Sequence, residues 1–172
     1  MKKVLLFVAL AAIFCTAAVW TGCFDDIFSG TMIYEEYDNG LCVEYMKSGN
    51  TICNLVFDER FFKNAVAEVS IHTSSGTVQI SNQPSMMEYL IEKGFSKDED
   101  NKQLHFEDGD VSMIVSYHSN KIMEVKINLK KPLTAIPIYI SSNGDMIKCP
   151  NSPDEIKKIF GKPSLVSSHH FI

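Results

Sequence analysis

The sequence predicts an α+β fold in which two short helices, at about 85–94 and 152–161, pack on one face of an antiparallel sheet of hairpins. Short runs of β-branched and aromatic residues alternate with polar ones and are separated by turns rich in Gly, Asn and Ser. Two segments instead carry the start and stop signals of helices. The 150 residues that follow an apolar leader over 1–22 suit one domain with a sizeable core.

The strands are expected as a series of hairpins. Thr31–Tyr37 is the first, with Met32, Tyr34 and Glu36 on one face. The other strand-like runs are 41–46, 51–57, 65–72, 77–81, 104–106, 111–117, 122–129 and 138–140. The run at 122–129 alternates most cleanly, and its apolar face comprises Met123, Val125, Ile127 and Leu129. This pattern predicts a strand with one buried and one exposed side.

Capping residues mark the two helices. The first is expected to begin after Ser85 and to end at Gly94, with Glu88 placed three residues after the serine for a capping box. The second is expected to begin after Ser152 and to end at Gly161, with a proline at its first helical position. Both segments therefore predict helices of two to three turns.

The order of a hairpin followed by a capped helix occurs twice, at Val69–Gly94 and at Ile138–Gly161. A degenerate repeat would give this order, and so would convergent capping chemistry, so both interpretations stay open. Asp58 is expected to cap one further helical turn within 57–62.

The leader has the composition of an export signal. Two lysines precede the apolar stretch Val4–Val19, and Thr21-Gly22 stands directly before Cys23. Two other interpretations stay open from these residues. One is conventional cleavage after Ala18, and the other is an uncleaved anchor, because Val4–Gly22 approaches the ~20 residues that a membrane-spanning helix needs.

Thr21-Gly22-Cys23 resembles the end of the bacterial lipoprotein signal, whose cysteine becomes lipid-modified. The resemblance implies a signal peptide over 1–22, a lipid on Cys23, a tether over 23–30 and a single domain over 31–172. Acyl chains would hold the protein on a membrane, because each buried CH2 contributes about 0.8 kcal/mol. The location implied is the bacterial cell envelope, facing the periplasm or the cell exterior.

The second capped helix, with its Gly161-Lys162-Pro163 stop, is similar to the helix-Gly-x-Pro element of small envelope proteins of the BamE/SmpA and β-lactamase-inhibitor-like group. In that group a short helix precedes an antiparallel sheet. The element covers about a quarter of the chain and carries no catalytic residues. The resemblance implies a sheet surface that binds protein.

Charge narrows the choice of partners. Without 1–22 the chain loses two lysines and no acid, which leaves 14 basic and 21 acidic side chains and a formal net charge of −7. Such a charge repels phosphate backbones, and the longest basic run is Lys130-Lys131, so no nucleic-acid partner is expected. The same charge favours a basic protein partner.

Three cysteines remain after the leader and Cys23. Cys42 and Cys53 flank the turn Lys47-Ser48-Gly49-Asn50 between two strand-like runs, so a disulfide between them depends on the pairing register and is left open. Cys149 is most simply a small buried residue. There is no Cys-x-x-Cys motif that would indicate a zinc ribbon or a redox site.

A search for chemistry finds no catalytic motif, no metal-ligand spacing among the histidines and no phosphate-binding loop, so no catalytic residue, metal or cofactor is expected. The leading hypothesis is a non-enzymatic, membrane-tethered protein-binding module, either of inhibitor or immunity type or an envelope assembly factor. The alternative is a periplasmic hydrolase with dispersed residues such as Asp58, His105 and Glu107. That alternative predicts a deep pocket that gathers perturbed acids and a histidine.

Overall fold

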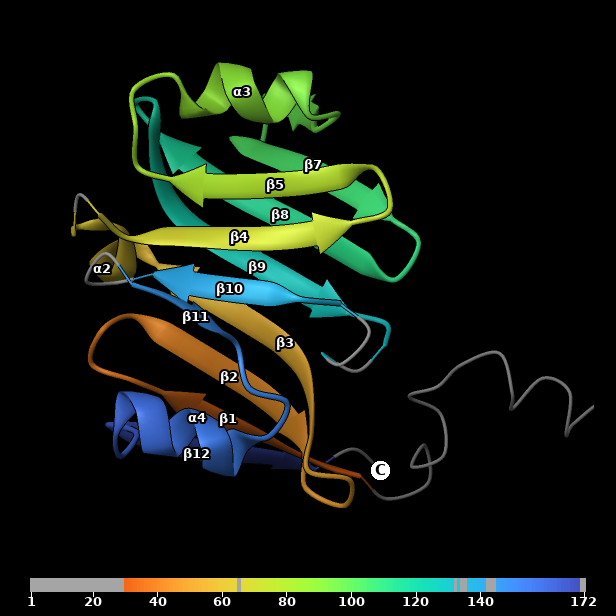
Figure 1. Cartoon of the computed structure of the whole chain (residues 1–172), viewed down its shortest axis with the longest axis vertical. Coiled ribbons are helices and arrows are strands. Elements are labelled where there is room, and N and C mark those ends of the chain that lie inside the picture. The colour runs from red at the N-terminus through yellow and green to blue at the C-terminus, as the bar shows by residue number, and fades with distance from the viewer. Residues whose placement is uncertain (1–29, 65, 132, 134–135, 142–144, 171–172) are drawn as a thin grey trace, which may run out of the picture.

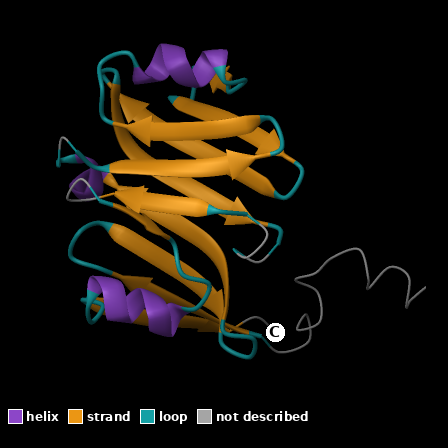
Figure 2. Ribbon diagram, in the orientation of Figure 1, coloured by secondary structure: helices purple, strands orange, loops and turns teal. Residues whose placement is uncertain are grey.

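The computed structural model describes residues 30–170 except 65, 132, 134–135 and 142–144. Strands dominate it, at 53 % against 14 % for helices, and the described strands form two antiparallel sheets (Figures 1 and 2). The predicted α+β class is therefore wrong. Most of the strand runs were predicted, but not the strands at 96–98 and 165–170. The strands divide between two sheets that bury each other's apolar faces, so a second sheet rather than a helical layer covers most of the core.

The large sheet has eight strands in the order β12-β1-β2-β3-β9-β8-β7-β6. They are β1 (Thr31–Glu36), β2 (Leu41–Met46), β3 (Thr51–Asp58), β6 (Ser96–Asp98), β7 (Gln103–Asp108), β8 (Val111–His118), β9 (Lys121–Leu129) and β12 (Leu165–His170). The small sheet has the order β11-β10-β4-β5. Its strands are β4 (Glu68–Thr73), β5 (Gly76–Ser81), β10 (Ile138–Ser141) and β11 (Met146–Lys148).

The described helices are α2 (Glu59–Phe62), α3 (Met86–Glu92) and α4 (Pro153–Phe160), which confirms the three helical segments that the caps predicted. Asp58 caps α2 by accepting from the Arg60 N–H at 2.8 Å, and Ser152 caps α4. The capping box predicted at Ser85 is not formed. With φ −90° and ψ 6°, Ser85 lacks the extended backbone that lets an N-cap side chain reach back to the helix.

The two sheets and the helices enclose one hydrophobic core. In Figure 1 the small sheet lies in front of the upper and middle strands of the large sheet, α4 lies in front of β1 and β2, and α3 lies at the top. The inner faces supply the core, for example through Leu55, Phe57 and Ile127 from the large sheet and Val69, Ile71 and Ile80 from the small one. The outer face of the large sheet is polar and partly exposed, as expected for an antiparallel sheet with one solvated side.

The fold has an internal pseudo-twofold symmetry. The first half (β1–β6 with α2 and α3) and the second half (β7–β12 with α4) each consist of a three-stranded meander, a hairpin, a helix and a final strand. Exchanging the halves reproduces both sheet orders read from the opposite end. In the large sheet the halves meet at β3 and β9, where Val56 lies opposite Lys126, and in the small sheet they meet at β4 and β10. This topology supports the repeat interpretation over convergent capping alone, although common ancestry of the halves stays a prediction.

The same irregularity in both meanders strengthens the correspondence. The pairing of β2 with β3 shifts immediately before Tyr45 and makes Cys53 the extra residue, and the pairing of β8 with β9 shifts immediately before Tyr117 and makes Met123 the extra residue. A β-bulge inserts one extra residue, so the residues beyond it point to the opposite face of the sheet from the one that a regular alternation would give them. For this reason Met123 does not continue the predicted inward face, and Ile122 is buried in its place.

Candidate functional site

A buried carboxylate stands out at one end of the sandwich. The α4 end, formed by β12, β1, β2 and α4, contains Glu35, whose relative exposure is only 2 %. Side chains alternate along a strand, so Glu35 shares the inward face of β1 with Ile33 and with Tyr37 just beyond the strand. An acid on the core side of a sheet costs free energy unless its oxygens are hydrogen-bonded.

Three donors satisfy Glu35. The Tyr37 hydroxyl donates to Oε2 at 3.0 Å, and the Tyr45 hydroxyl donates to Oε1 at 2.8 Å. Lys157, from α4, places its Nζ 2.8 Å from Oε1. The cluster thus joins β1 to α4 through an ion pair between a buried carboxylate and a partly exposed lysine, with two neutral donors beside it.

The environment keeps both tyrosines protonated. Burial raises the pKa of Tyr37 and of Tyr45, and the negative charge and hydrogen bonding of Glu35 raise them further. A tyrosine that stays neutral keeps its O–H as a donor toward the carboxylate. The arrangement is therefore a set of fixed donors around one acceptor.

A shallow pocket of about 520 Å³ opens onto this cluster. It is lined by Glu35, Lys157, Gly161, Lys162, Pro163 and Val166. Glu35 and Lys157 supply charged groups, whereas Pro163 and Val166 supply apolar wall. This is the mixed lining expected of a recognition pocket.

The pseudo-twofold symmetry shows what the fold itself requires at this place. Glu35 lies opposite Val43, two residues before the bulge tyrosine of β2. Leu104 lies opposite Val115, two residues before the bulge tyrosine of β8. At the α3 end, formed by β6, β7, β8 and α3, Leu104 therefore occupies the place of Glu35.

The other members of the cluster are replaced in the same way. Phe106 takes the place of Tyr37, and Leu90 takes the place of Lys157, since each lies five residues after the serine that precedes its helix. Leu104, Phe106 and Leu90 are all buried. The fold is thus compatible with an apolar cluster here, and the polar cluster under α4 is a property of this sequence rather than a demand of the architecture.

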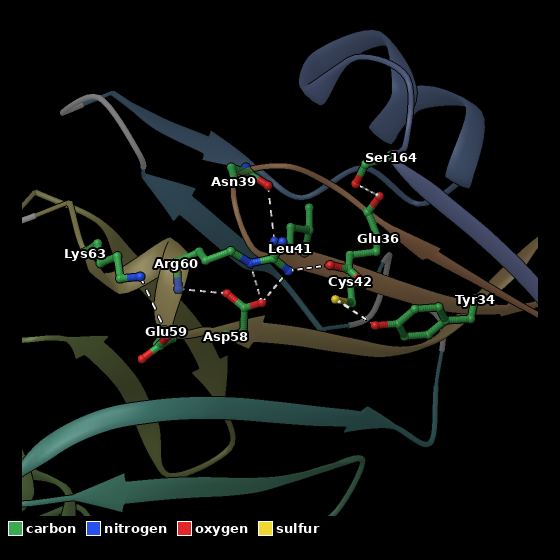
Figure 3. A network of polar contacts seen from close by, with 10 residues as sticks. All are labelled: Tyr34, Glu36, Asn39, Leu41, Cys42, Asp58, Glu59, Arg60, Lys63 and Ser164. Atoms are coloured by element: carbon green, nitrogen blue, oxygen red, sulfur yellow. Dashed lines mark hydrogen bonds and ion pairs between the residues drawn. The ribbon is translucent and has the colours of Figure 1, made fainter.

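A second polar network, on the outer face of the large sheet, has a structural role (Figure 3). Arg60 bridges Glu36 of β1 and Asp58 at the end of β3, with its Nε 2.8 Å from Asp58 Oδ2. Ser164 donates its hydroxyl to the Glu36 carbonyl at 3.0 Å. The network ties α2 and the segment before β12 to the first strand.

Gly40 shows how closely this network is packed. It has φ +85°, and a Cβ at this position would lie 2.2 Å from Asp58 Oδ1 and 2.6 Å from the Phe61 amide nitrogen. Only glycine fits such a conformation beside backbone atoms.

A pocket of about 380 Å³ lies between the two sheets, near His72 and Asp108. The Ser74 hydroxyl and the Ser75 N–H, from the β4–β5 turn, donate to the Asp108 carboxylate and lower its pKa to about 2. Its oxygens therefore hold the turn of the small sheet against the turn of the large one.

The residues named for a hydrolase do not form one site. Asp58 lies at the end of β3, and β9 and β8 separate it from His105 and Glu107 on β7. His105 Nε2 is 4.0 Å from Asp98, and Glu107 pairs with Lys130. Among the described residues no three His, Cys, Asp or Glu side chains are grouped as a metal site.

The disulfide left open between Cys42 and Cys53 is not formed. Cys42 is a free, buried thiol whose sulfur accepts a hydrogen bond from Tyr34 at 3.1 Å. The register places Cys42 opposite Val56, which is three residues from Cys53 along β3, so the two cysteines are not neighbours across the strands. Cys149 is buried as expected, and burial raises its pKa to about 12.

Several large aromatic side chains near this end belong to the core. Phe61, Phe62, Tyr37 and Tyr45 are all buried, so they do not form an exposed contact patch. Sequence reasoning missed the Glu35 cluster. The alternation Ile33, Glu35, Tyr37 was the available signal, but a strand pattern alone does not tell which face is buried.

The predicted signal peptide over 1–22, the predicted lipid site Cys23 and the predicted tether as far as residue 29 lie outside the described residues. None of the helices that the structure describes is long and apolar enough to cross a membrane. No family model, curated protein or solved structure matches this chain.

Proposed function

We propose that the chain is a lipid-anchored protein of the bacterial cell envelope whose folded domain binds another protein through its α4 end. One observation carries the proposal: most of the large, exposed apolar side chains fall in one stretch near the C-terminus. Within 146–166 these are Met146, Ile147, Ile159, Leu165 and Val166. Three of them, Ile159, Leu165 and Val166, belong to α4 and β12, and Ile159 and Val166 line pockets there. Exposed apolar residues gathered beside pockets are typical of an interaction surface.

Charge around α4 refines the partner. A net charge of −7 attracts a basic protein at long range. The pockets on either side of α4, however, include Lys148, Lys157, Lys158 and Lys162 among their lining residues. The groups in direct contact with α4 would therefore include carboxylates, and binding would weaken as salt screens these pairs.

The direct test is affinity capture from an envelope extract with the domain from Phe24 onward, at low and high salt, followed by identification of bound proteins by mass. We expect one specific partner that Leu165→Ser/Val166→Ser loses. The matched control is Ile91→Ser, which removes an exposed apolar side chain, 47 % exposed, at the α3 end. Equal capture by all three proteins, or no specific partner, would count against the proposal.

The anchor has its own test. Cys23→Ser in the full chain should abolish metabolic labelling with a radioactive fatty acid and release the protein from the membrane fraction. Cys53→Ser is the matched control and should leave labelling unchanged. Labelling that survives Cys23→Ser would contradict lipid attachment at this residue.

A further inference from the structure

The pocket at the α4 end exists because the two helices end differently. After α3, Gly94 has φ +94°, and the Phe95 N–H donates back to the Leu90 carbonyl at 3.0 Å. Together with the bond from Gly94 to the Ile91 carbonyl, this is a Schellman turn, which folds the following residue onto the helix. Phe95 is consequently 4 % exposed and stacks on Phe106 with ring centroids 4.9 Å apart.

The chain leaves α4 in another direction. Gly161 keeps a single helical bond to the Lys157 carbonyl at 2.9 Å, and its ψ of −163° sends the chain into an extended path. Lys162 takes the place that Phe95 has after α3, but its side chain is exposed and lines the pocket. Pro163 then follows and cannot donate a hydrogen bond back to the helix. At the α4 end the Phe160 ring instead packs edge-on against Tyr37, with ring centroids 6.3 Å apart, and the space beside Lys162 and Pro163 stays open as the pocket.

The edge strands next to the two helices also differ, because one is protected against pairing and the other is not. β6, at the α3 end, is three residues long and carries Lys97 and Asp98, which are features that protect an edge. β12 is six residues long and contains no Lys, Arg, Asp, Glu or Pro. No strand among the described residues pairs with its outer side. Its free backbone groups can accept another strand.

The register connects this edge to the pocket. Val166 lies opposite Glu35 and lines the same pocket, so its side chain shares the inner face of the sheet with that of Glu35. A strand added beside β12 would place one residue opposite Val166, with its side chain on that face. That side chain would lie over the pocket.

We propose that β12 binds an extended segment of the partner protein as an added strand, and that this segment places a tyrosine side chain in the pocket. The ring would rest on Pro163 and Val166, the apolar part of the pocket lining. The hydroxyl would donate to Glu35, which already accepts from the hydroxyls of Tyr37 and Tyr45. This inference rests on the proposed function and names the mode of binding. A second copy paired through β12 would not supply the ring, because β12 contains no Phe, Tyr or Trp.

A tethered strand tests the mode without knowledge of the partner. The domain from Phe24 is extended after Ile172 by a glycine-rich turn and a six-residue β-forming strand, with tyrosine or alanine at the position opposite Val166. Chemical denaturation and amide hydrogen exchange of β12 are measured for both. We expect protection of the outer β12 amides and a folding equilibrium constant about 10- to 100-fold larger with tyrosine than with alanine.

Filling the pocket from within provides the control. Lys162→Phe places an aromatic ring in the pocket and should abolish the difference in folding equilibrium constant between the tyrosine and alanine extensions. If this variant fails to fold, Val166→Lys changes an exposed position beside the pocket and should have the same effect. Equal equilibrium constants for the two extensions in the unmodified domain would overturn the proposal. So would a difference that persists in the folded Lys162→Phe or Val166→Lys variant.

The envelope capture separates this mode from the proposed function. Suppose that a partner is lost with Leu165→Ser/Val166→Ser but is bound fully by Lys162→Phe. This result would support the proposed function and overturn the proposal that a tyrosine enters the pocket. Absence of any partner, with a tyrosine-dependent gain in the tethered strand, would reject the function and support the pocket. Self-association in sedimentation that Lys162→Phe dissociates would assign the surface to a second copy and overturn the proposal.

Discussion

The α4 and α3 ends of the sandwich have the same architecture but different chemistry. At the α3 end, Leu90, Leu104 and Phe106 are buried and Phe95 seals the helix against the sheet. At the α4 end, Lys157 and Glu35 form an ion pair in the matching place, and a pocket remains open. The comparison shows that the fold needs only an apolar or fully hydrogen-bonded cluster under each helix. The polar cluster beside an open strand edge is a feature that this sequence adds at the α4 end.

The largest expected effect comes from breaking the polar cluster at one member. Glu35→Leu leaves two buried tyrosine hydroxyls without an acceptor and leaves Lys157 only the more distant Asp154, so the free energy of unfolding should fall by about 3–5 kcal/mol. Glu35→Leu/Tyr37→Phe/Lys157→Leu copies the α3 end and should recover stability to within about 2 kcal/mol of the unmodified protein. Urea denaturation measures both, and a single variant as stable as the parent would show that the cluster does not stabilise the fold.

The turn glycines give the next comparison. Gly40 and Gly109 both have positive φ and follow the first strand of their halves, but a Cβ at Gly109 meets nothing within 4 Å. Gly109→Ala should cost about 1–2 kcal/mol, the strain of a left-handed residue. Gly40→Ala should cost about 2–4 kcal/mol because Asp58 and the backbone at Phe61 must also move. Thermal denaturation of the two variants measures both losses of stability, and equal losses would contradict the close packing at Gly40.

Tyr45 and Tyr117, the tyrosines beside the two bulges, allow the two ends to be compared with the same residue type. Tyr45→Phe removes a hydrogen bond to the Glu35 carboxylate and should reduce the free energy of unfolding by about 1.5–3 kcal/mol. Tyr117→Phe, at the corresponding place in β8, should change it by no more than about 0.5 kcal/mol. Urea denaturation provides both values. The reverse order would mean that the two ends do not correspond as described.

The smallest effect concerns the residues before these glycines. The Asn39 side chain accepts a local bond from the Leu41 N–H at 3.1 Å, whereas Asp108 holds the β4–β5 turn. Because hydrogen bonding lowers the pKa of Asp108 from 3.8 to about 2, its contribution is complete above pH 3.8 and is lost as pH falls toward 2. Asp108→Asn should flatten the pH dependence of stability in this window, and Asn39→Ser, which adds no titratable group, should leave it unchanged. A parental profile in Asp108→Asn would contradict this assignment.

Local signals in the sequence were sufficient for elements whose cause is local. Asp58 and Ser152 cap their helices as predicted, because an N-cap acts within a few residues. The hairpins also formed near their turn residues. The bulges at Tyr45 and Tyr117 were not foreseen, since the extra residue is defined only by the register of the partner strand.

The candidate site could not be predicted in this way. Lys157 is distant in sequence from Glu35, and they meet only because β12 returns to pair with β1. The alternation in β1 gave two possible faces and no means of choosing the buried one. Asp58, His105 and Glu107 were chosen for their side-chain chemistry alone, and in the sheet two strands separate Asp58 from the other two residues.

By itself the sequence indicated the three helices, most of the strands except β6 and β12, and the negative charge of the chain, because turn chemistry, caps and composition act over short distances. Tertiary structure alone decided that the strands form two sheets, that Glu35 is buried under α4, and that one helix ends in a sealed aromatic contact while the other leaves a pocket. Those features depend on register and on contacts between residues far apart in the chain, and the free energy of such contacts exists only once the whole core has assembled.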